Sequence, residues 1–309
     1  MPPLTVLLND WEEYSLLDSG HRRKLERFGS TVVVRSEPKA WWSPDLNRHE
    51  WNGAGAVCDE DGTWHLKRDL PREWLVRFDD LTLEARLADT SRHVGVFPEQ
   101  SPHWRWIRDR CPSSGQAKPK LLSLFGYTGV ATLQAAAHGF AVTHVDASKP
   151  ALAWARRNQE LSGLADAPIR WMLDDALKFV RREQRRGNRY DAMILDPPSF
   201  GRGPSGEVWK VEARLPELLS VCRGLLSDEA LFAILTLYNL EASALMIHNL
   251  LAETLGDRDG ALEVGELALR HAHSSKLLPL ALFGRWEAEQ DRGGSGYQDG
   301  SVPHPTAPE

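Results

Sequence analysis

The amino-acid sequence predicts an α/β fold, in which a mostly parallel, seven-stranded sheet covered by helices follows a smaller β-rich domain. Two observations lead to this prediction. After residue 112, short apolar runs alternate with stretches long enough for a helix, which is the rhythm of a parallel sheet buried on both faces. Before residue 112, short β-type segments are separated by Trp, Pro and Gly, which indicates strands joined by turns. A chain of 309 residues is long enough for two domains.

The composition excludes several classes of protein. The 42% of hydrophobic and 26% of charged residues are typical of a globular protein, and the net charge of −6 gives no global positive field for nucleic acid or a membrane surface. Cys58, Cys111 and Cys222 form neither a CxxC pair nor a Cys/His cluster, so we expect no metal and a reducing, cytoplasmic setting. No apolar stretch reaches the ~20 residues of a membrane helix.

Residues 1–112 are predicted to form the β-rich accessory domain. Eight of the twelve tryptophans lie there, and they either stack on nucleic-acid bases or, as is commoner in a small β-rich domain, fill its core. The predicted strands of this domain are Thr31–Val34, Gly55–Val57, Thr63–Leu66 and Leu81–Leu87.

A Pro/Gly/Ser-rich linker before Lys120 separates this region from a second domain, residues 113–288. Residues 289–309 have no apolar period and are predicted to be a disordered tail. The predicted helices of the second domain, with their caps, are Val130–His138, Lys149–Leu161 and Asp175–Arg186. Its predicted strands are Lys120–Tyr127, Ala141–Ala147, Ile169–Asp174, Asp191–Pro197, Ala230–Tyr238, Leu262–Arg270 and Leu277–Trp286.

The first of these strands runs into a turn that contains Gly126 and Gly129. Glycine at such a place lets a ligand approach the backbone at the carboxyl end of the strand, although the same turn also occurs as an ordinary strand-to-helix connection. The dinucleotide fingerprint G-x-G-x-x-G is absent, which disfavours a nicotinamide cofactor.

Carboxylates end the next two strands. Asp146 can accept both hydroxyls of a ribose, or it can cap the following helix, a role that Ser148 fills equally well. Asp174 and Asp175 can accept from an adenine amino group or simply start the next helix, whose dipole favours negative charge.

The most specific pattern is Asp196-Pro197-Pro198, which breaks an apolar strand where its carboxyl end is expected. Two prolines fix the backbone and remove two donors, so the carboxylate and nearby carbonyls are held as acceptors. Such an edge suits a substrate N–H group beside a methyl donor, whereas in the simpler interpretation the prolines only terminate the strand.

These segments together resemble the class I methyltransferases, which have a Rossmann-like fold. Within that class they are similar to the bacterial large-subunit ribosomal-RNA methyltransferases of the cytosine-C5 type and their relatives. The similarity runs from about Asp18 to Trp286. Besides the segments above, it includes Asp18–Gly20, Lys24–Gly29, Gly95–Gln100 and Val145–Lys149.

The resemblance implies S-adenosylmethionine as the cofactor and a base of structured ribosomal RNA as the acceptor. It further implies that Gly95–Gln100 covers the cofactor and that the amino-terminal domain is an accessory or RNA-binding domain. The transfer site implied by the resemblance is lined by Asp196, Pro197 and Pro198, with Asp196 also touching the cofactor. The other implied cofactor contacts are Phe125, Gly126, Tyr127, Thr128 and Gly129 at the methionine end, Asp146 with Ala147 and Ser148 at the ribose, and Asp175 and Ala176 at the adenine.

Cytosine-C5 methylation needs a cysteine thiolate that adds to C6 of the base. The resemblance implies this cysteine at the end of the fifth strand, where the chain reads Leu235-Thr-Leu-Tyr-Asn239, or at position 199, which is Ser199. Cys222 lies among leucines of a helical segment and is expected to be a buried apolar residue. We therefore expect direct methyl transfer to a nitrogen or another ready nucleophile, with Asp196 accepting the proton.

Two further segments bear on the substrate. Gly201–Trp209 is predicted to be a mobile loop at the mouth of the site, and the arginine-rich stretch Arg181–Arg189 contacts phosphates or is a solvated helix end. The alternatives that stay open are a small-molecule or protein methyltransferase and a non-catalytic, S-adenosylmethionine-responsive RNA-binding module. The sequence gives no indication of the oligomeric state.

Overall fold

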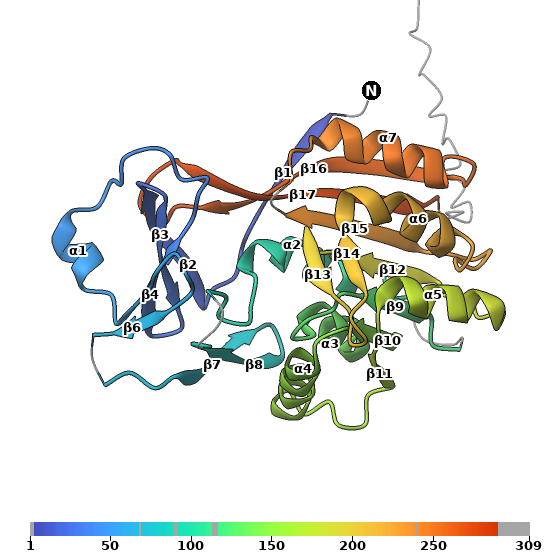
Figure 1. Ribbon diagram of the computed structural model, residues 1–309, viewed down its shortest axis with the longest axis horizontal. Helices are drawn as coiled ribbons and strands as arrows, with labels where there is room; N and C mark the ends of the chain where they lie inside the picture. The colour runs from blue at the N-terminus through green and yellow to red at the C-terminus, as the bar shows by residue number, and fades with distance from the viewer. Residues whose placement is uncertain (1–2, 68, 89–91, 113–116, 239, 290–309) are drawn as a thin grey trace, which may run out of the picture.

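The protein is described by a computed structural model, shown in Figure 1, in which residues 3–67, 69–88, 92–112, 117–238 and 240–289 are placed. The predicted tail, residues 289–309, lies outside the described residues except for its first residue. A large mixed sheet with helices on both faces occupies one side of the molecule, and a smaller β-rich unit lies beside it (Figure 1).

The large sheet has eight strands in the order β1-β16-β17-β15-β12-β9-β10-β11. Neighbouring strands run parallel except that β17 is antiparallel to both β15 and β16. The bounds are β1 Leu4–Leu8, β9 Lys120–Leu124, β10 Ala141–Asp146, β11 Ile169–Leu173, β12 Ala192–Leu195, β15 Phe232–Tyr238, β16 Gly260–Arg270 and β17 Leu277–Ala288.

The prediction of a mostly parallel α/β sheet is confirmed, and all seven predicted strands are present. The predicted number of strands, seven, was wrong, because β1 is an eighth strand of the sheet. It pairs in parallel with β16, from Leu4 opposite Val264 to Leu8 opposite Ala268. β1 belongs to the predicted accessory region, so one strand crosses the boundary expected at residue 113. The division into residues 1–112 and 113–288 otherwise stays a prediction.

Helices cover the two faces of the sheet in two groups. On one face α2 packs on α3 and α3 on α4, and on the other α5 packs on α6 and α6 on α7. Three of these helices have a side-chain N-cap. Ser148, Asp175 and Ser243 each accept a backbone N–H group in the first turn of α4, α5 and α7, respectively. The bounds are α2 Ser101–Arg108, α3 Val130–Ala137, α4 Lys149–Leu161, α5 Ala176–Arg185, α6 Val211–Arg223 and α7 Ala244–Leu255.

The amino-terminal unit is a five-stranded sheet in the order β2-β3-β4-β5-β6, with a separate hairpin β7–β8 and the short helix α1. Of the eight tryptophans in residues 1–112, two of which lie in α2, four are buried, three are half-buried and Trp41, at 79%, is well exposed, so most of them fill a core. The bounds are β2 Tyr14–Gly20, β3 Arg23–Phe28, β4 Thr31–Ser36, α1 Arg48–Asn52, β5 Ala56–Cys58, β6 Trp64–Leu66, β7 Glu73–Phe78 and β8 Leu81–Arg86.

The hydrophobic core of this unit continues into the large sheet. Trp11 and Phe78 belong to the same buried cluster as Leu133 of α3 and Leu269 and Leu278 of the β16–β17 hairpin. The 3-10 helix Pro98–Gln100 then carries the chain from this core to α2 and the edge of the sheet. The shared core fixes the position of the segment before α2 relative to the strand ends.

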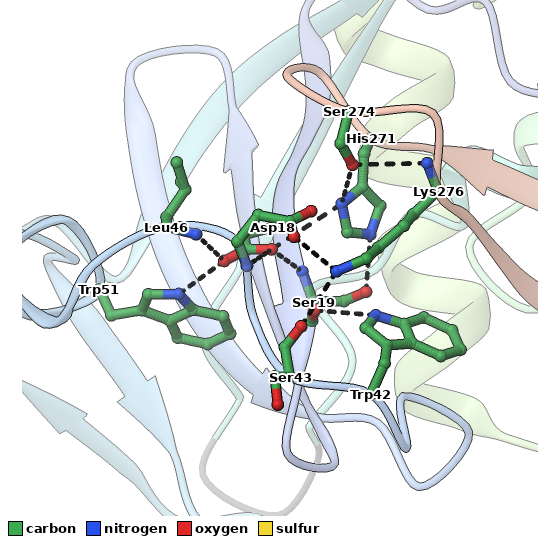
Figure 2. A network of polar contacts seen from close by, with 10 residues as sticks. Asp18, Ser19, Trp42, Ser43, Leu46, Trp51, His271, Ser274 and Lys276 are labelled. Carbon is green, nitrogen blue, oxygen red and sulfur yellow. Dashed lines mark hydrogen bonds and ion pairs between the residues drawn. The ribbon is translucent and has the colours of Figure 1, made fainter.

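A polar network ties the tip of the β16–β17 hairpin to the carboxyl end of β2 (Figure 2). The Asp18 carboxylate accepts the backbone N–H of Ser19 at 2.8 Å and of Leu46 at 2.8 Å, and the indole N–H of Trp51 at 2.9 Å. His271 of the hairpin lies with its Nε2 2.7 Å from the Ser19 hydroxyl. Because the donors around Asp18 come from three segments of the accessory unit, this carboxylate has a structural role there.

Candidate functional site

A cavity of about 520 Å³ opens where β9, β10, β11, β12 and β15 end, which is the carboxyl edge of the parallel strands. The chain order of the strands reverses between β9 and β12, and such a switch point is where open α/β sheets bind ligands. The residues that line the cavity are Arg92, His93, Phe97, Phe125, Tyr127, Val145, Asp146, Ala147, Ser148, Asp174, Asp175, Ala176, Asp196, Pro197, Pro198, Ser199, Gly201, Arg202, Gly203, Trp209 and Tyr238.

Of the predicted site residues, only Gly126, Thr128 and Gly129 are not among those that line the cavity. They shape the turn after β9: Gly129 has φ +82°, and the Thr128 hydroxyl donates to the carbonyl of Gly95 at 2.5 Å. Phe125 and Tyr127 also have positive φ values, 57° and 49°, which is uncommon for side chains of this size and holds both rings at the cavity.

Packing against a neighbouring strand also requires a glycine at position 126. A Cβ atom at this position would lie 2.3 Å from the imidazole of His144, so the glycine gives room to a buried side chain of β10. Burial lowers the pKa of His144 to about 3, which makes this ring neutral, and its Nδ1 lies 2.8 Å from the Thr132 hydroxyl. A cofactor contact through the backbone of Gly126 stays a prediction.

The variant Gly126→Ala is expected to destabilise the protein, because the methyl group overlaps the His144 ring inside a packed core. Overpacking of this kind costs about 1–3 kcal/mol. Thermal unfolding measures it, with Gly55→Ala as the matched control, since a Cβ there meets its neighbours at ordinary distances of 3.4 to 3.6 Å. An equal unfolding temperature for Gly126→Ala and the wild type would contradict this account.

Asp146 ends β10 and faces the cavity with a half-buried carboxylate. Its Oδ2 accepts the Tyr127 N–H at 2.8 Å and its Oδ1 accepts the Ser148 N–H at 2.7 Å. Burial raises the pKa of Asp146, and these two N–H donors oppose the rise. Ser148, not Asp146, caps α4 through its hydroxyl, so the Asp146 carboxylate keeps lone pairs for a ligand.

The two carboxylates after β11 have partners in the protein. Asp175 is the N-cap of α5 and accepts the Lys178 N–H at 2.9 Å, which is the helix-start role considered above. Asp174 accepts the Asp175 N–H at 2.9 Å and pairs with Arg182 at 2.7 Å. Both still line the cavity together with Ala176, so contact with a ligand there stays a prediction.

Asp196, at the end of β12, has an unusual environment. Its Oδ2 accepts the side-chain amide of Gln100 at 3.1 Å, whereas its Oδ1 is buried and has no partner within the described part of the chain. The same Gln100 nitrogen lies 3.1 Å from the Tyr238 hydroxyl. Burial, with the buried Glu99 nearby, raises the pKa of Asp196 to about 8, and the Gln100 donor opposes this rise.

Sequence reasoning missed Arg92, His93 and Tyr238 as cavity residues. Tyr238 is the last residue of β15, so its place at a strand end was the one signal that could have found it. Arg92 and His93 lie in an irregular segment that carries no pattern. Gln100 was named only as part of a covering segment, and Phe97 of that segment does line the cavity.

The predicted mobile loop after Asp196-Pro197-Pro198 is instead a β-hairpin, with β13 Phe200–Arg202 and β14 Val208–Lys210. Trp209 holds it in place, because its indole N–H donates to the Pro198 carbonyl at 2.7 Å and its ring lies 4.9 Å from that of Phe125. One of the carbonyls expected to be a free acceptor is therefore already used within the protein.

The cysteine of α6 agrees with expectation. Cys222 is buried in α6 and burial raises the pKa of its thiol to about 12, as expected for an apolar core residue. Throughout the described ranges, no helix is long and apolar enough to cross a bilayer.

A switch-point cavity with carboxylates at successive strand ends defines an α/β protein that binds a nucleoside-containing cofactor. Residues 58–253 match the family described as S-adenosylmethionine-dependent methyltransferase. The crystal structure of the SAM dependent methyltransferase from Agrobacterium tumefaciens is 43% identical, and the match covers 92% of this chain and 94% of that one with a TM-score of 0.88. The chain belongs to the S-adenosylmethionine-dependent methyltransferase family, and the predicted fold, cofactor and enzyme class are confirmed.

Two curated relatives are ribosomal RNA methyltransferases by name. Ribosomal RNA large subunit methyltransferase K/L of Hahella chejuensis is 36% identical over 135 residues, which is 43% of this chain and 18% of the relative. Ribosomal RNA large subunit methyltransferase I of Klebsiella pneumoniae is 34% identical over 109 residues, which is 35% of this chain and 24% of the relative. The chain thus spans less than a quarter of the length of these two relatives.

Proposed function

We propose that this enzyme methylates a base of ribosomal or other structured RNA by direct transfer, without a cysteine adduct. The observation that carries the proposal is the buried Oδ1 of Asp196 at the cavity, which has no partner among the residues that the structure describes. A buried carboxylate oxygen without a donor is costly unless a ligand supplies one, and a nucleophile that loses a proton during methylation is such a donor. The names of the ribosomal RNA methyltransferases that the chain resembles support RNA as the acceptor.

The residues of the cavity fit S-adenosylmethionine. The cavity volume of about 520 Å³ suits a nucleoside-containing ligand. Asp146 offers carboxylate oxygens to it, and the rings of Phe97, Phe125 and Tyr127 provide apolar walls. Once bound, this cofactor supplies an already activated methyl group. We propose that Asp146 with Ala147 and Ser148 holds the ribose, Asp175 and Ala176 the adenine, and the turn Phe125–Gly129 the methionine end.

The chain's own part in the reaction is then positioning and proton acceptance. Pro197 and Pro198 fix the backbone beside Asp196, and Gln100 fixes its Oδ2, so that Oδ1 is held in one place. Asp196 accepts the proton that the acceptor atom releases. Since all three cysteines are free thiols, we propose the reducing cytoplasm as the setting.

The test is transfer of labelled methyl from S-adenosylmethionine to total RNA from a strain that lacks this protein, followed by nucleoside analysis. A labelled N-methylated base is the expected result. Labelled 5-methylcytosine would overturn the adduct-free mechanism. Unlabelled RNA together with labelled protein or metabolites would overturn the RNA acceptor, and binding of the cofactor without any transfer would show a cofactor-sensing module.

The pH dependence of kcat/KM is expected to follow Asp196. Because its pKa is raised to about 8, the carboxyl is mostly protonated at neutral pH and accepts a proton only in its ionised form. The value of kcat/KM should therefore rise with pH, about tenfold per unit well below the pKa, and level off above about pH 8. A profile already flat from pH 6 upward would exclude Asp196 as the proton acceptor.

Replacing the buried thiol is expected to leave catalysis unchanged. Cys222 lies in α6 among leucines that pack on the large sheet, and it is not among the residues that line the cavity. In Cys222→Ala the methylation rate per folded molecule should equal that of the wild type, even if the unfolding temperature falls. Complete loss of methylation by a folded Cys222→Ala protein would instead establish a thiolate mechanism.

A further inference from the structure

The β13–β14 hairpin (yellow in Figure 1) has two different faces. In its register Phe200 lies opposite Lys210, Gly201 opposite Trp209, and Arg202 opposite Val208. Cross-strand partners share a face and successive residues alternate, so Gly201 and Trp209 form one face and the other four residues the second. Trp209 is buried against the cavity, which turns the second face outward.

The outer face of the hairpin, which we define as Phe200, Arg202, Val208 and Lys210, is apolar and cationic at once. Phe200 is 53% exposed and Val208 46% exposed, and both cations are exposed as well. No ion pair or hydrogen bond within the described ranges engages the side chain of Arg202 or Lys210. An exposed aromatic ring flanked by two cations matches an unpaired base that stacks and the phosphates on either side of it.

The outer face also lies beside the transfer site and is held rigidly there. Phe200 follows Asp196 by four residues, and Arg202 lines the mouth of the cavity. The Trp209 hydrogen bond to Pro198 fixes the hairpin to the strand end that carries Asp196. A base stacked on Phe200 is therefore adjacent to whatever base enters the cavity.

A second, basic groove continues from the hairpin. It has a volume of about 410 Å³ and is lined by Glu207, Val208 and Trp209 on the hairpin side and by cations of α5 and α6 on the other. Glu207 pairs with Lys178, and Glu217 pairs with both Arg181 and Arg214, whereas Arg185 has no ion pair in the part of the chain that the structure describes. The lining cations are Lys178, Arg181, Arg185 and Arg214. These four cations outnumber the two lining carboxylates, Asp175 and Glu207, and the remaining positive charge favours an RNA backbone that leaves the cavity along this groove.

We propose that the outer face of the hairpin is an RNA-binding surface, on which an unpaired base next to the acceptor stacks on Phe200 while Arg202 and Lys210 contact its phosphates. This proposal rests on RNA being the acceptor. It assigns to the hairpin the local positive and aromatic surface that a chain with a net charge of −6 needs in order to hold RNA.

The experiment measures binding of a fluorescein-labelled RNA stem-loop with an unpaired loop to the full chain, by fluorescence anisotropy at several salt concentrations. Phe200→Leu removes the ring but keeps an apolar side chain, and it should weaken binding about fivefold or more, whereas Phe200→Trp should restore it. Arg202→Gln and Lys210→Gln should each lower the slope of log affinity against log salt by about 0.7.

The matched control for charge is Arg156→Gln, which removes an exposed cation of α4 and should leave affinity and slope unchanged. Binding of S-adenosylhomocysteine by each variant shows that the cavity is intact. If the wild-type protein methylates RNA but the hairpin variants bind the stem-loop with the same affinity and salt dependence as the wild type, the hairpin proposal alone is overturned.

If wild-type protein neither binds nor methylates RNA, the proposed function fails and the hairpin proposal with it. If Phe200→Leu instead converts a dimer into a monomer at unchanged RNA affinity, the outer face is an interface between two copies of the chain, and its assignment to RNA is overturned.

Discussion

In Asp196→Asn, kcat is expected to fall by about a hundredfold or more, because the amide cannot take up the proton that the acceptor loses, and general base catalysis contributes about 10²–10⁴ in rate. The amide is almost the same shape, and its oxygen can still accept the Gln100 N–H that now reaches Oδ2. The fold and the cofactor affinity should therefore be kept. The measurement is single-turnover methyl transfer at saturating cofactor.

Calorimetric binding of S-adenosylhomocysteine to Asp196→Asn is the control, and it should agree with the wild type within a few-fold. The variant also removes the titrating group, so the rise of kcat/KM toward pH 8 should disappear. A variant that keeps both its rate and the wild-type pH profile would show that Asp196 only holds a substrate N–H in place and that another group accepts the proton.

For Asp146→Ala we expect at least tenfold weaker binding of S-adenosylmethionine. A hydrogen bond to a charged group contributes about 1.5–3 kcal/mol, and a tenfold change in affinity corresponds to about 1.4 kcal/mol. Isothermal titration calorimetry measures the affinity directly. Asp166→Ala, which removes an exposed carboxylate between α4 and β11, is the charge-matched control and should bind normally.

Asp146 also holds the backbone N–H groups of Tyr127 and Ser148, so its replacement can loosen the turn. Asp146→Asn separates the two effects, since the amide keeps one acceptor oxygen and a similar shape. We expect an intermediate affinity for it. Wild-type affinity in a normally folded Asp146→Ala protein would remove this residue from the cofactor site.

The parts of the fold that the sequence predicted are those with local signals. β9, β10 and β12 are apolar runs ended by Gly, Asp or Pro, and α4 carries its own cap in Ser148. The three-residue strands β13 and β14 have no such signal, because a Gly- and Pro-rich segment of this length is typical of a loop. Their pairing depends on Trp209 reaching Pro198 and Phe125.

The site residues likewise divide into those that a local sequence signal marks and those that only tertiary contacts bring together. Asp146 and Asp196 could be found because each one ends an apolar strand. Gln100 could not, because its bonds to Asp196 and Tyr238 join residues that are 96 and 138 positions apart in the chain. The packing need for Gly126 could not be predicted either, since its neighbour His144 is placed beside it only when β9 and β10 pair. Contacts of this kind come from tertiary packing and leave no periodic pattern in the sequence.

The position of β1 has a consequence for synthesis on the ribosome. This strand is made long before its partner β16, which begins at Gly260, so its backbone groups stay unpaired until all the elements from β2 to α7 have been made. Contacts of such long sequence separation form slowly, and an unpaired apolar strand is prone to aggregate in the meantime. A nascent chain that stalls before β16 would therefore expose Leu4–Leu8 as a target for chaperones.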